Sequence, residues 1–156
     1  MSYKKFKAGI FSKKEYERSN QWGIDRVSEY LVNKGYSILE KEEDYDVDIT
    51  AVKNEKIYLF EAEVKRGYPF TSVDDFKFPT VSFLGRKKKY HTKHESGFYY
   101  CVVCFETGCI LSCHSSNIYI EDQRQLKTLS KKNRKGLDEF YLVPKENCIF
   151  TQKKEG

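Results

Sequence analysis

Two short segments that alternate charged and apolar residues, 46–51 and 60–65, constrain the fold of this chain most strongly. Successive side chains of a β-strand point to opposite faces of a sheet, so a strand of this kind has one polar face and one apolar face. In the first segment we expect the polar residues on one face and the apolar residues on the other: Asp46, Asp48 and Thr50 against Val47, Ile49 and Ala51.

The second segment repeats this pattern, with Glu61, Glu63 and Lys65 alternating with Phe60, Ala62 and Val64. The polar run 53–56 predicts a hairpin turn, which lays the two charged rows side by side. Carboxylates at this distance repel one another and favour protonation, so stability alone poorly explains several acids beside one lysine. A bound divalent cation such as Mg²⁺, which takes carboxylate and water oxygens, would resolve the repulsion.

The segments before this hairpin predict one helix followed by three antiparallel strands. Ser12 and Glu15 have the spacing of a capping box, and Gly35 suits the left-handed residue after a helix. Residues 13–34 are therefore expected to be helical, with a break near Gly23. The strand-like runs that follow are 36–40, 46–52 and 57–64.

The second half of the chain predicts further strands around one short helix. Residues 66–80 contain Gly67 and two prolines, which is typical of a loop, and 80–90 is expected to be a short helix with a basic last turn. Two further strand pairs are expected, 98–105 with 109–114, and 140–144 with 148–150. The order is α-β-β-β-α-β with additions, in a single domain spanning 1–156.

The composition is that of a folded protein, and its net positive charge makes a polyanionic binding partner plausible. Lysine and arginine outnumber aspartate and glutamate by 28 to 23, which gives a net charge of +5. No stretch reaches the roughly 18–20 apolar residues needed to span a bilayer, so no membrane association is expected. The N-terminal residues lack the apolar segment of a secretory signal, and a cytoplasmic protein is expected.

The hairpin segment resembles the PD-(D/E)xK nuclease superfamily, whose signature is an acid on one core strand and an acid-x-lysine triplet on the next. Here these are Asp48 and Glu63-Val64-Lys65, and the helix from Asp25 to Gly35-Tyr36 is similar to that of Holliday-junction resolvases. The resemblance covers about residues 20–66. The chain departs from the pattern because no proline precedes Asp48 and because Asp46 and Glu61 are additional acids, both candidate ligands.

The resemblance implies an α/β (α+β) fold with a restriction-endonuclease-like αβββαβ core, in which helices flank a central mixed sheet. It implies a metal-dependent nuclease that hydrolyses phosphodiester bonds, as a DNA endonuclease that is resolvase-like or restriction-like. Asp48 and Glu63 would bind Mg²⁺, for which Mn²⁺ substitutes, with the Val64 carbonyl as a further ligand. Asp25 would support the metal or its water, and Lys65 would orient the attacking water. A homodimer is expected for the resolvase-like version, since two symmetric cuts need two sites.

A basic cluster at 85–94 offers phosphate contacts beside this site. Its members are Arg86, Lys87, Lys88, Lys89 and Lys93. The competing interpretation is a solvated helix end whose cations complement the helix dipole. A second basic run, 127–135, is expected to be a surface loop or arm.

Four cysteines and a histidine lie close together in 101–114, and short spacings of this kind can indicate a zinc site. On paired strands, however, Cys101 and Cys104 project to opposite faces and cannot both reach one ion, so buried free thiols are the preferred interpretation. His114 either lines the active cleft or is structural.

Two alternatives to the nuclease hypothesis stay open, one structural and one functional. The acids and Lys65 can form a solvated cross-strand charge pattern, or the chain can be a non-catalytic nucleic-acid-binding protein that retains the nuclease fold.

Overall fold

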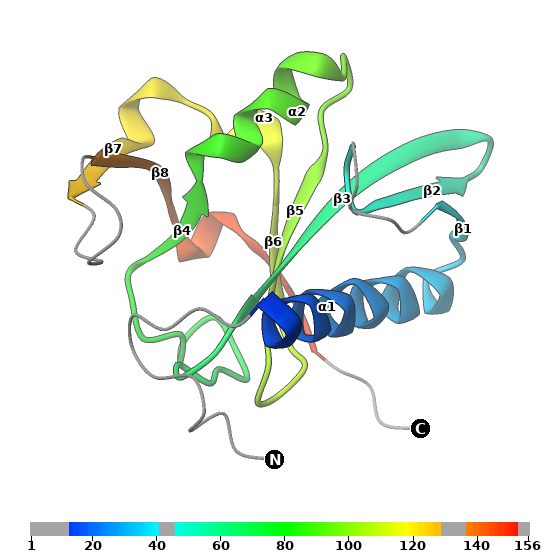
Figure 1. Cartoon of the computed structure of the whole chain (residues 1–156), viewed down its shortest axis with the longest axis horizontal. Helices are drawn as coiled ribbons and strands as arrows, with labels where there is room; N and C mark the ends of the chain where they lie inside the picture. The colour runs from blue at the N-terminus through cyan, green and yellow to red at the C-terminus, as the bar shows by residue number, and fades with distance from the viewer. Residues whose placement is uncertain (1–12, 41–45, 129–136, 153–156) are drawn as a thin grey trace.

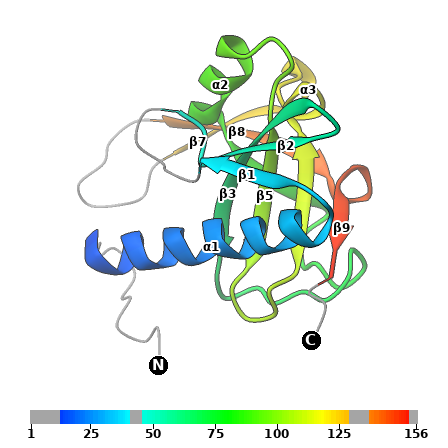
Figure 2. The same ribbon diagram turned by 90° about the vertical axis from the view of Figure 1, so that its right-hand side faces the viewer.

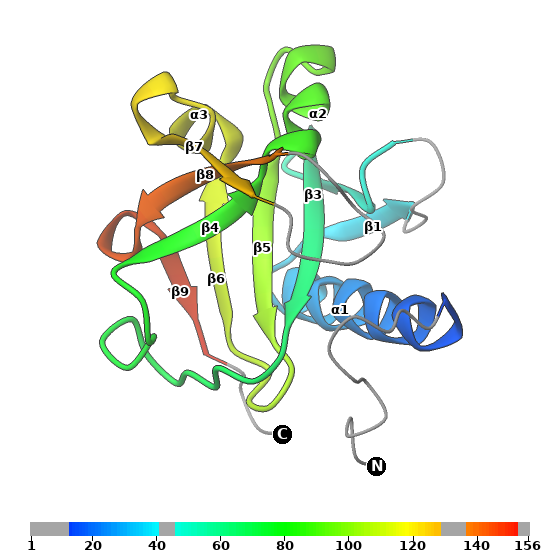
Figure 3. The ribbon, with the colours of Figure 1, turned by 60° about the vertical axis from the view of Figure 1, so that its left-hand side comes forward.

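The structure is a computed structural model that describes residues 13–40, 46–128 and 137–152. Helix α1 (Lys13–Asn33) covers one face of a six-stranded sheet, and a three-stranded sheet packs on the opposite face (Figures 1 and 3). The fold is α+β with a mixed sheet. In the described part of the chain, no helix is long and apolar enough to cross a membrane.

Helix α1 forms because its apolar residues recur on one side. Ile24, Val27 and Leu31 are spaced by three and four residues and are almost completely buried against the sheet. The helix ends as expected at Gly35, whose φ of +94° favours glycine, while the Tyr36 N–H donates to the Leu31 carbonyl at 2.9 Å. The expected break near Gly23 is wrong, because α1 is continuous through this residue.

The six-stranded sheet has the order β1-β2-β3-β5-β6-β9 (Figure 2). All neighbouring pairs are antiparallel except β3 and β5, which are parallel. The expected hairpin between β2 and β3 is confirmed, with positive φ angles at Asn54 and Glu55 in its two-residue turn. The strand bounds are β1 Ser37–Glu40, β2 Ile49–Lys53, β3 Lys56–Lys65, β5 Tyr99–Cys104, β6 Ile110–His114 and β9 Ile149–Thr151.

The second sheet has the order β4-β8-β7 and corrects two expectations. Residues 80–84 form β4 rather than a helix, because Val81 and Phe83 alternate into the core with period two. Segments 140–144 and 148–150 do not pair with each other, since β8 joins β4 and β7 while β9 joins β6. The strand bounds are β4 Thr80–Leu84, β7 Arg124–Thr128 and β8 Leu137–Pro144.

Short helices connect these strands. The expected helical character after residue 80 begins only at Gly85, in η2 (Gly85–Lys87) and α2 (Lys88–Lys93). The others are α3 (Ser115–Ile118), η3 (Glu121–Gln123) and η4 (Lys145–Asn147). The described part of the second basic run, residues 127 and 128, belongs to β7 rather than to the expected loop, and 129–135 lie outside the described residues.

The core has two parts, one on each face of the six-stranded sheet. Phe60, Ala62, Ile49 and Ala51 pack with α1, as their alternation predicts. Val47 breaks the predicted alternation because it packs in the other cluster, with the three-stranded sheet. The physical reason is that regular strand geometry begins only at Ile49, so the backbone before it does not keep the strand's two-residue period.

Gly23 lets α1 pack tightly against β3. A Cβ atom placed there would lie 2.6 Å from Cγ2 of Val64, a stiff β-branched side chain. We predict that Gly23→Ala lowers the free energy of unfolding by about 1–3 kcal/mol through overpacking, although alanine is the better helix former. Urea unfolding measures this effect. In Gly23→Ala/Val64→Ala the loss should be smaller than the sum of the two single losses, and strict additivity would contradict the assigned contact.

Candidate active site

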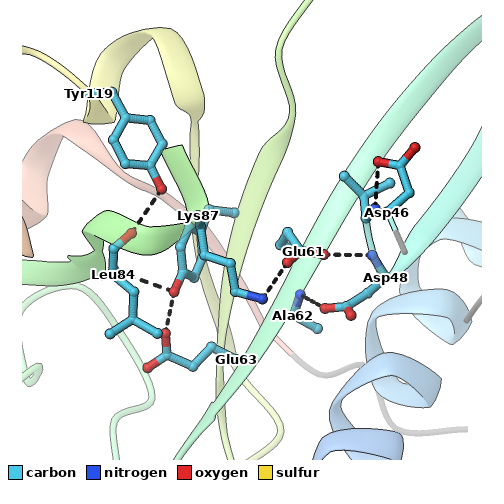
Figure 4. A network of polar contacts seen from close by, with 10 residues as sticks. Asp46, Asp48, Glu61, Ala62, Glu63, Leu84, Lys87 and Tyr119 are labelled. Atoms are coloured by element: carbon cyan, nitrogen blue, oxygen red, sulfur yellow. Dashed lines mark hydrogen bonds and ion pairs between the residues drawn. The ribbon is translucent and has the colours of Figure 1, made fainter. Parts of the chain in front are cut away.

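The charged residues meet where the β2–β3 ladder ends. The last ladder pair is Ile49 with Phe60, and beyond it side chains take over the backbone hydrogen bonds. The Asp48 N–H donates to Oε2 of Glu61 at 2.5 Å, and the Ala62 N–H donates to Oδ2 of Asp48 at 2.9 Å (Figure 4). Asp48, just before β2, and Glu61 in β3 therefore each bind the backbone of the other segment, which places two carboxylates side by side.

Glu61 also forms an ion pair with η2, the short helix that follows β4. Its Oε1 lies 2.6 Å from Nζ of Lys87 in η2, and the Glu61 side chain is only 1% exposed. Burial lowers the pKa of Lys87, but the attraction and hydrogen bond of Glu61 outweigh it, so the net pKa is raised. Lys87 stays an ammonium ion and offsets part of the negative charge at this end of the hairpin.

Asp48 is the carboxyl group most perturbed by this arrangement. Burial, and after it the charge of Glu61, raise the pKa of Asp48 to about 7. The Ala62 N–H and Lys87 act in the opposite direction and only partly offset these causes. A carboxyl group with such a pKa can exchange a proton or an attached cation near neutral pH.

Glu63 occupies a separate position two residues further along β3. Its Oε2 lies 2.8 Å from Nζ of Lys65, and its Oε1 accepts a hydrogen bond from the Tyr100 hydroxyl. Tyr100 is buried on the neighbouring strand β5, and burial followed by the charge of Glu63 raises its pKa well above the usual value. The phenol therefore remains a donor that orients Glu63.

A pocket of about 250 Å³ opens along β3 beside these groups. Glu63 and Val64 contribute its strand wall, while Arg86 and Lys87 contribute cations from η2. It is lined by Ser19, Asn20, Ala62, Glu63, Val64, Leu84, Arg86 and Lys87. A pocket with both carboxylate and cationic walls can receive a phosphate while holding groups that activate water.

Of the five expected acids, only Glu63 lines this pocket. Asp48 and Glu61 contact its lining residues Ala62 and Lys87, whereas the other two acids lie elsewhere. Asp25 is exposed on α1, accepts a hydrogen bond from Gln21 at 2.9 Å, and lines a different pocket, between α1 and β1. Asp46 contacts α2 instead, with Oδ1 at 2.7 Å from Nε2 of His94 and Oδ2 at 3.3 Å from Nζ of Lys93.

The basic cluster divides into two kinds of residue. Lys87 is engaged with Glu61, whereas Arg86, Lys88 and Lys89 are exposed along η2 and α2. Lys93 is exposed as well and forms the ion pair with Asp46.

Several residues of the site escaped the sequence analysis. Tyr100 has the strand-like surroundings of a core aromatic, and Ser19 and Asn20 carry no local pattern. Lys87 was expected to contact phosphate, but its pairing with Glu61 was not, because nothing in the run of four basic residues distinguishes the one that turns inward. Only the fold brings these residues to Glu61 and Glu63.

The cysteines confirm the expected geometry of their strands. Cys101 packs on the α1 side of the sheet and Cys104 on the opposite side, and all five thiols are free and buried. His114 lies outside the pocket lining and caps α3, with Nδ1 at 2.8 Å from Oγ of Ser116.

The donor chemistry at this edge fits a hard cation, although every acid already has a partner. Among the residues described, no group of three or more histidine, cysteine, aspartate or glutamate side chains is placed to hold a metal ion. Mg²⁺ needs only one or two protein carboxylates, with waters completing its shell. An ion at Asp48 and Glu61 would compete with Lys87 for Glu61, and an ion at Glu63 would compete with Lys65.

Comparisons with known proteins leave the resemblance to nucleases as a hypothesis. No protein-family model matches this chain, and no curated protein matches its sequence.

The raised pKa of Asp48 predicts a stability that falls as pH rises. Between about pH 4 and 7 the folded chain keeps a proton on Asp48 that the unfolded chain, with a carboxyl pKa near 3.9, has released. The folded state binds more protons, so its free energy of unfolding decreases with increasing pH across this window.

Asp48→Asn removes this titration and keeps an oxygen for the Ala62 N–H. From pH 4.5 to 7.5 we expect the wild type to lose about 1–3 kcal/mol relative to the variant, measured by urea unfolding in EDTA. Parallel pH profiles for the two proteins would refute the assignment.

Proposed function

We propose that this protein is a metal-dependent nuclease that hydrolyses phosphodiester bonds, acting as a DNA endonuclease on a restriction-endonuclease-like core. The observation that carries the proposal is the gathering of three acids and three cations at one end of β3. The acids are Asp48, Glu61 and Glu63, and the cations are Lys65, Arg86 and Lys87. The element order, with α1, three antiparallel strands, and β5 parallel to β3 after a helical segment, supports the core.

The acids would hold the cation, which supplies Lewis acidity and lowers the pKa of bound water. Asp48 pairs spatially with Glu61, so these two form one candidate ligand pair, while Glu63 with the Val64 carbonyl forms the other. Asp25 has no part in this proposal because it lines another pocket.

The lysines would act on the phosphate and the attacking water. Lys65 and Lys87 each neutralise one carboxylate, at 2.8 and 2.6 Å. When a phosphodiester enters the pocket, either ammonium group can turn to the charge that develops on the phosphate oxygens, and Arg86 can bind a neighbouring phosphate. Tyr100 keeps Glu63 oriented during this exchange.

Cleavage assays test the proposal. Supercoiled, linear, single-stranded and branched DNA are incubated with Mg²⁺, Mn²⁺ or EDTA. We expect cation-dependent cleavage, reduced about 100-fold or more in Glu63→Gln and in Asp48→Asn. Glu55→Gln, in the exposed hairpin turn, is the matched control and should retain full activity. Cleavage that both site variants leave unchanged would overturn the assignment.

Two matched substitutions assign the catalytic lysine. Lys65→Met and Lys87→Met are compared with Lys56→Met at the exposed start of β3. Loss of cleavage in only one of the first two identifies the ammonium group that serves the phosphate, provided that urea unfolding shows this variant to be folded under the assay conditions, because Lys87→Met leaves the buried Glu61 without its partner. Activity equal to that of the control in both variants would leave neither lysine in the mechanism.

A non-catalytic nucleic-acid-binding protein is the second candidate. The observation that favours it is the burial of Asp48 and Glu61, which are 3% and 1% exposed and bound to backbone amides and Lys87. Acids held in this way stabilise the hairpin whether or not a cation binds. DNA binding without cation-dependent cleavage in every preparation would select this function.

Both functions predict phosphate contacts from the exposed part of the basic cluster. The variant Arg86→Ala/Lys89→Ala should reduce the slope of log affinity against log salt by about 2, since each phosphate contact to duplex DNA contributes about 0.9. Fluorescence anisotropy in EDTA at several salt concentrations measures the slope. Lys34→Ala/Lys56→Ala removes two exposed cations elsewhere and should leave the slope unchanged. Equal slopes for the wild type and the first variant would exclude η2 and α2 from the interface.

A further inference from the structure

Another pocket, here called the aromatic pocket, is lined by Lys65 of the Glu63–Lys65 pair. It has a volume of about 240 Å³ and a mainly apolar wall, whose floor includes the buried side chains of Val81 and Val102. It is lined by Lys65, Tyr68, Phe76, Phe78, Pro79, Thr80, Val81, Ser82, Val102, Lys127 and Leu142. Its volume is smaller than the roughly 300–1,000 Å³ of pockets for drug-sized ligands, so it suits a single small ring system.

Two exposed aromatic residues stand at this pocket. Tyr68 and Phe78 are 44% and 41% exposed, and their ring centroids lie 5.1 Å apart. Phe78 is supported from below by Phe76, which packs in turn on the buried Phe70. The two rings are therefore positioned by the core, yet each keeps a large part of its surface open to a ligand.

Cations surround these rings. Nζ of Lys77 lies 5.1 Å from the centroid of Tyr68 and 5.7 Å from that of Phe78, while Lys65 and Lys127 line the pocket itself. A purely apolar ligand would gain nothing from the positive charge of these three lysines. An aromatic ligand that carries negative charge at its edge satisfies both the rings and the cations.

Lys65 connects this pocket with the candidate active site. It lines the aromatic pocket, and its ammonium group lies 2.8 Å from Glu63, which lines the first pocket. The two cavities thus differ in chemistry and share one ion pair as their boundary. A nucleotide has the same two parts, a phosphate and an adjoining aromatic base.

We propose that the aromatic pocket binds an unpaired nucleobase of single-stranded nucleic acid, with the strand's phosphates on Lys65, Lys77 and Lys127. An unpaired base is required because the bases of a duplex are stacked and cannot enter a pocket of this kind. Stacking on Tyr68 or Phe78 tolerates any base, and Thr80 and Ser82 offer hydroxyl groups to its edge. This inference rests on the proposed action on nucleic acid and names its substrate class as single-stranded, or locally unpaired, strands.

Binding of a fluorescent oligothymidylate of about 12 nucleotides, measured by anisotropy in EDTA, tests the inference. Phe78→Ala should weaken binding about 5- to 100-fold, the range expected for loss of one base-stacking partner. Phe78→Tyr keeps the aromatic face and should bind within about twofold of the wild type. Ile57→Ala, at a 60% exposed position in the β2–β3 hairpin, is the matched control and should have no effect.

An abasic strand of the same length separates stacking from charge. It keeps the phosphates and removes the bases, so the wild type should bind it about as weakly as Phe78→Ala binds oligothymidylate. Lys77→Gln should weaken both strands equally and reduce the salt slope by about 0.7. Equal binding of the two strands by the wild type, or an unchanged affinity in Phe78→Ala, would overturn the inference, as would an absence of single-strand binding.

The measurement in EDTA keeps this inference separable from the proposed function. Ring-dependent binding without cleavage in Mg²⁺ would support the base pocket and reject the nuclease. Cleavage in Mg²⁺ with ring-independent binding would support the nuclease and reject the base pocket.

Discussion

The ion pair between Glu61 and Lys87 is the interaction on which the charged end of the molecule depends. Glu61 is 1% exposed, so its carboxylate requires a partner, and Lys87 provides it at 2.6 Å. Removing one member of such a buried pair costs about 3–5 kcal/mol, because the other charge is left without compensation. Through its second oxygen Glu61 also holds the Asp48 backbone, so one side chain joins the β2–β3 hairpin to η2. The position of Arg86 beside the pocket follows from this connection.

The two layers that cover the six-stranded sheet leave Glu63 and Lys65, at the end of β3, partly exposed. Helix α1 covers one face, and the three-stranded sheet covers the other. The β2–β3 ladder ends at Ile49, so the last residues of β3 pair with β5 on one side and face the polar pocket on the other. The Glu63–Lys65 pair then separates a polar cavity from an aromatic one. This division is the structural basis for proposing that the phosphate to be cleaved is bound in the polar cavity and an unpaired base in the aromatic one.

Local patterns in the sequence were informative wherever neighbouring residues decide the structure. The period of α1, the positive φ at Gly35, and the turn between β2 and β3 each depend on a few consecutive residues, and all three were predicted. The helix predicted over 80–90 was wrong only for 80–84, because the alternation of Val81 and Phe83 over five residues is too short to distinguish a strand, whereas the basic half from Gly85 is helical. Tyr68 and Phe78 belong to the segment 66–80, for which the sequence predicts only a loop. A loop has no period that indicates which side chains are exposed, so their position beside Lys65 was not predicted.

The sequence by itself determined the hairpin and the charged face of β3, because a two-residue period places Glu61, Glu63 and Lys65 on one side of any strand. Only the tertiary structure decided which partners these residues have. Glu61 meets Lys87 across 26 positions, and Glu63 meets Tyr100 across 37, distances along the chain that no local pattern encodes. It also placed Asp25 at another pocket, since the packing of α1 on β3 sets which side of the helix faces the acids. Pairings of this kind arise from the joint burial of whole elements, and burial depends on the complete fold.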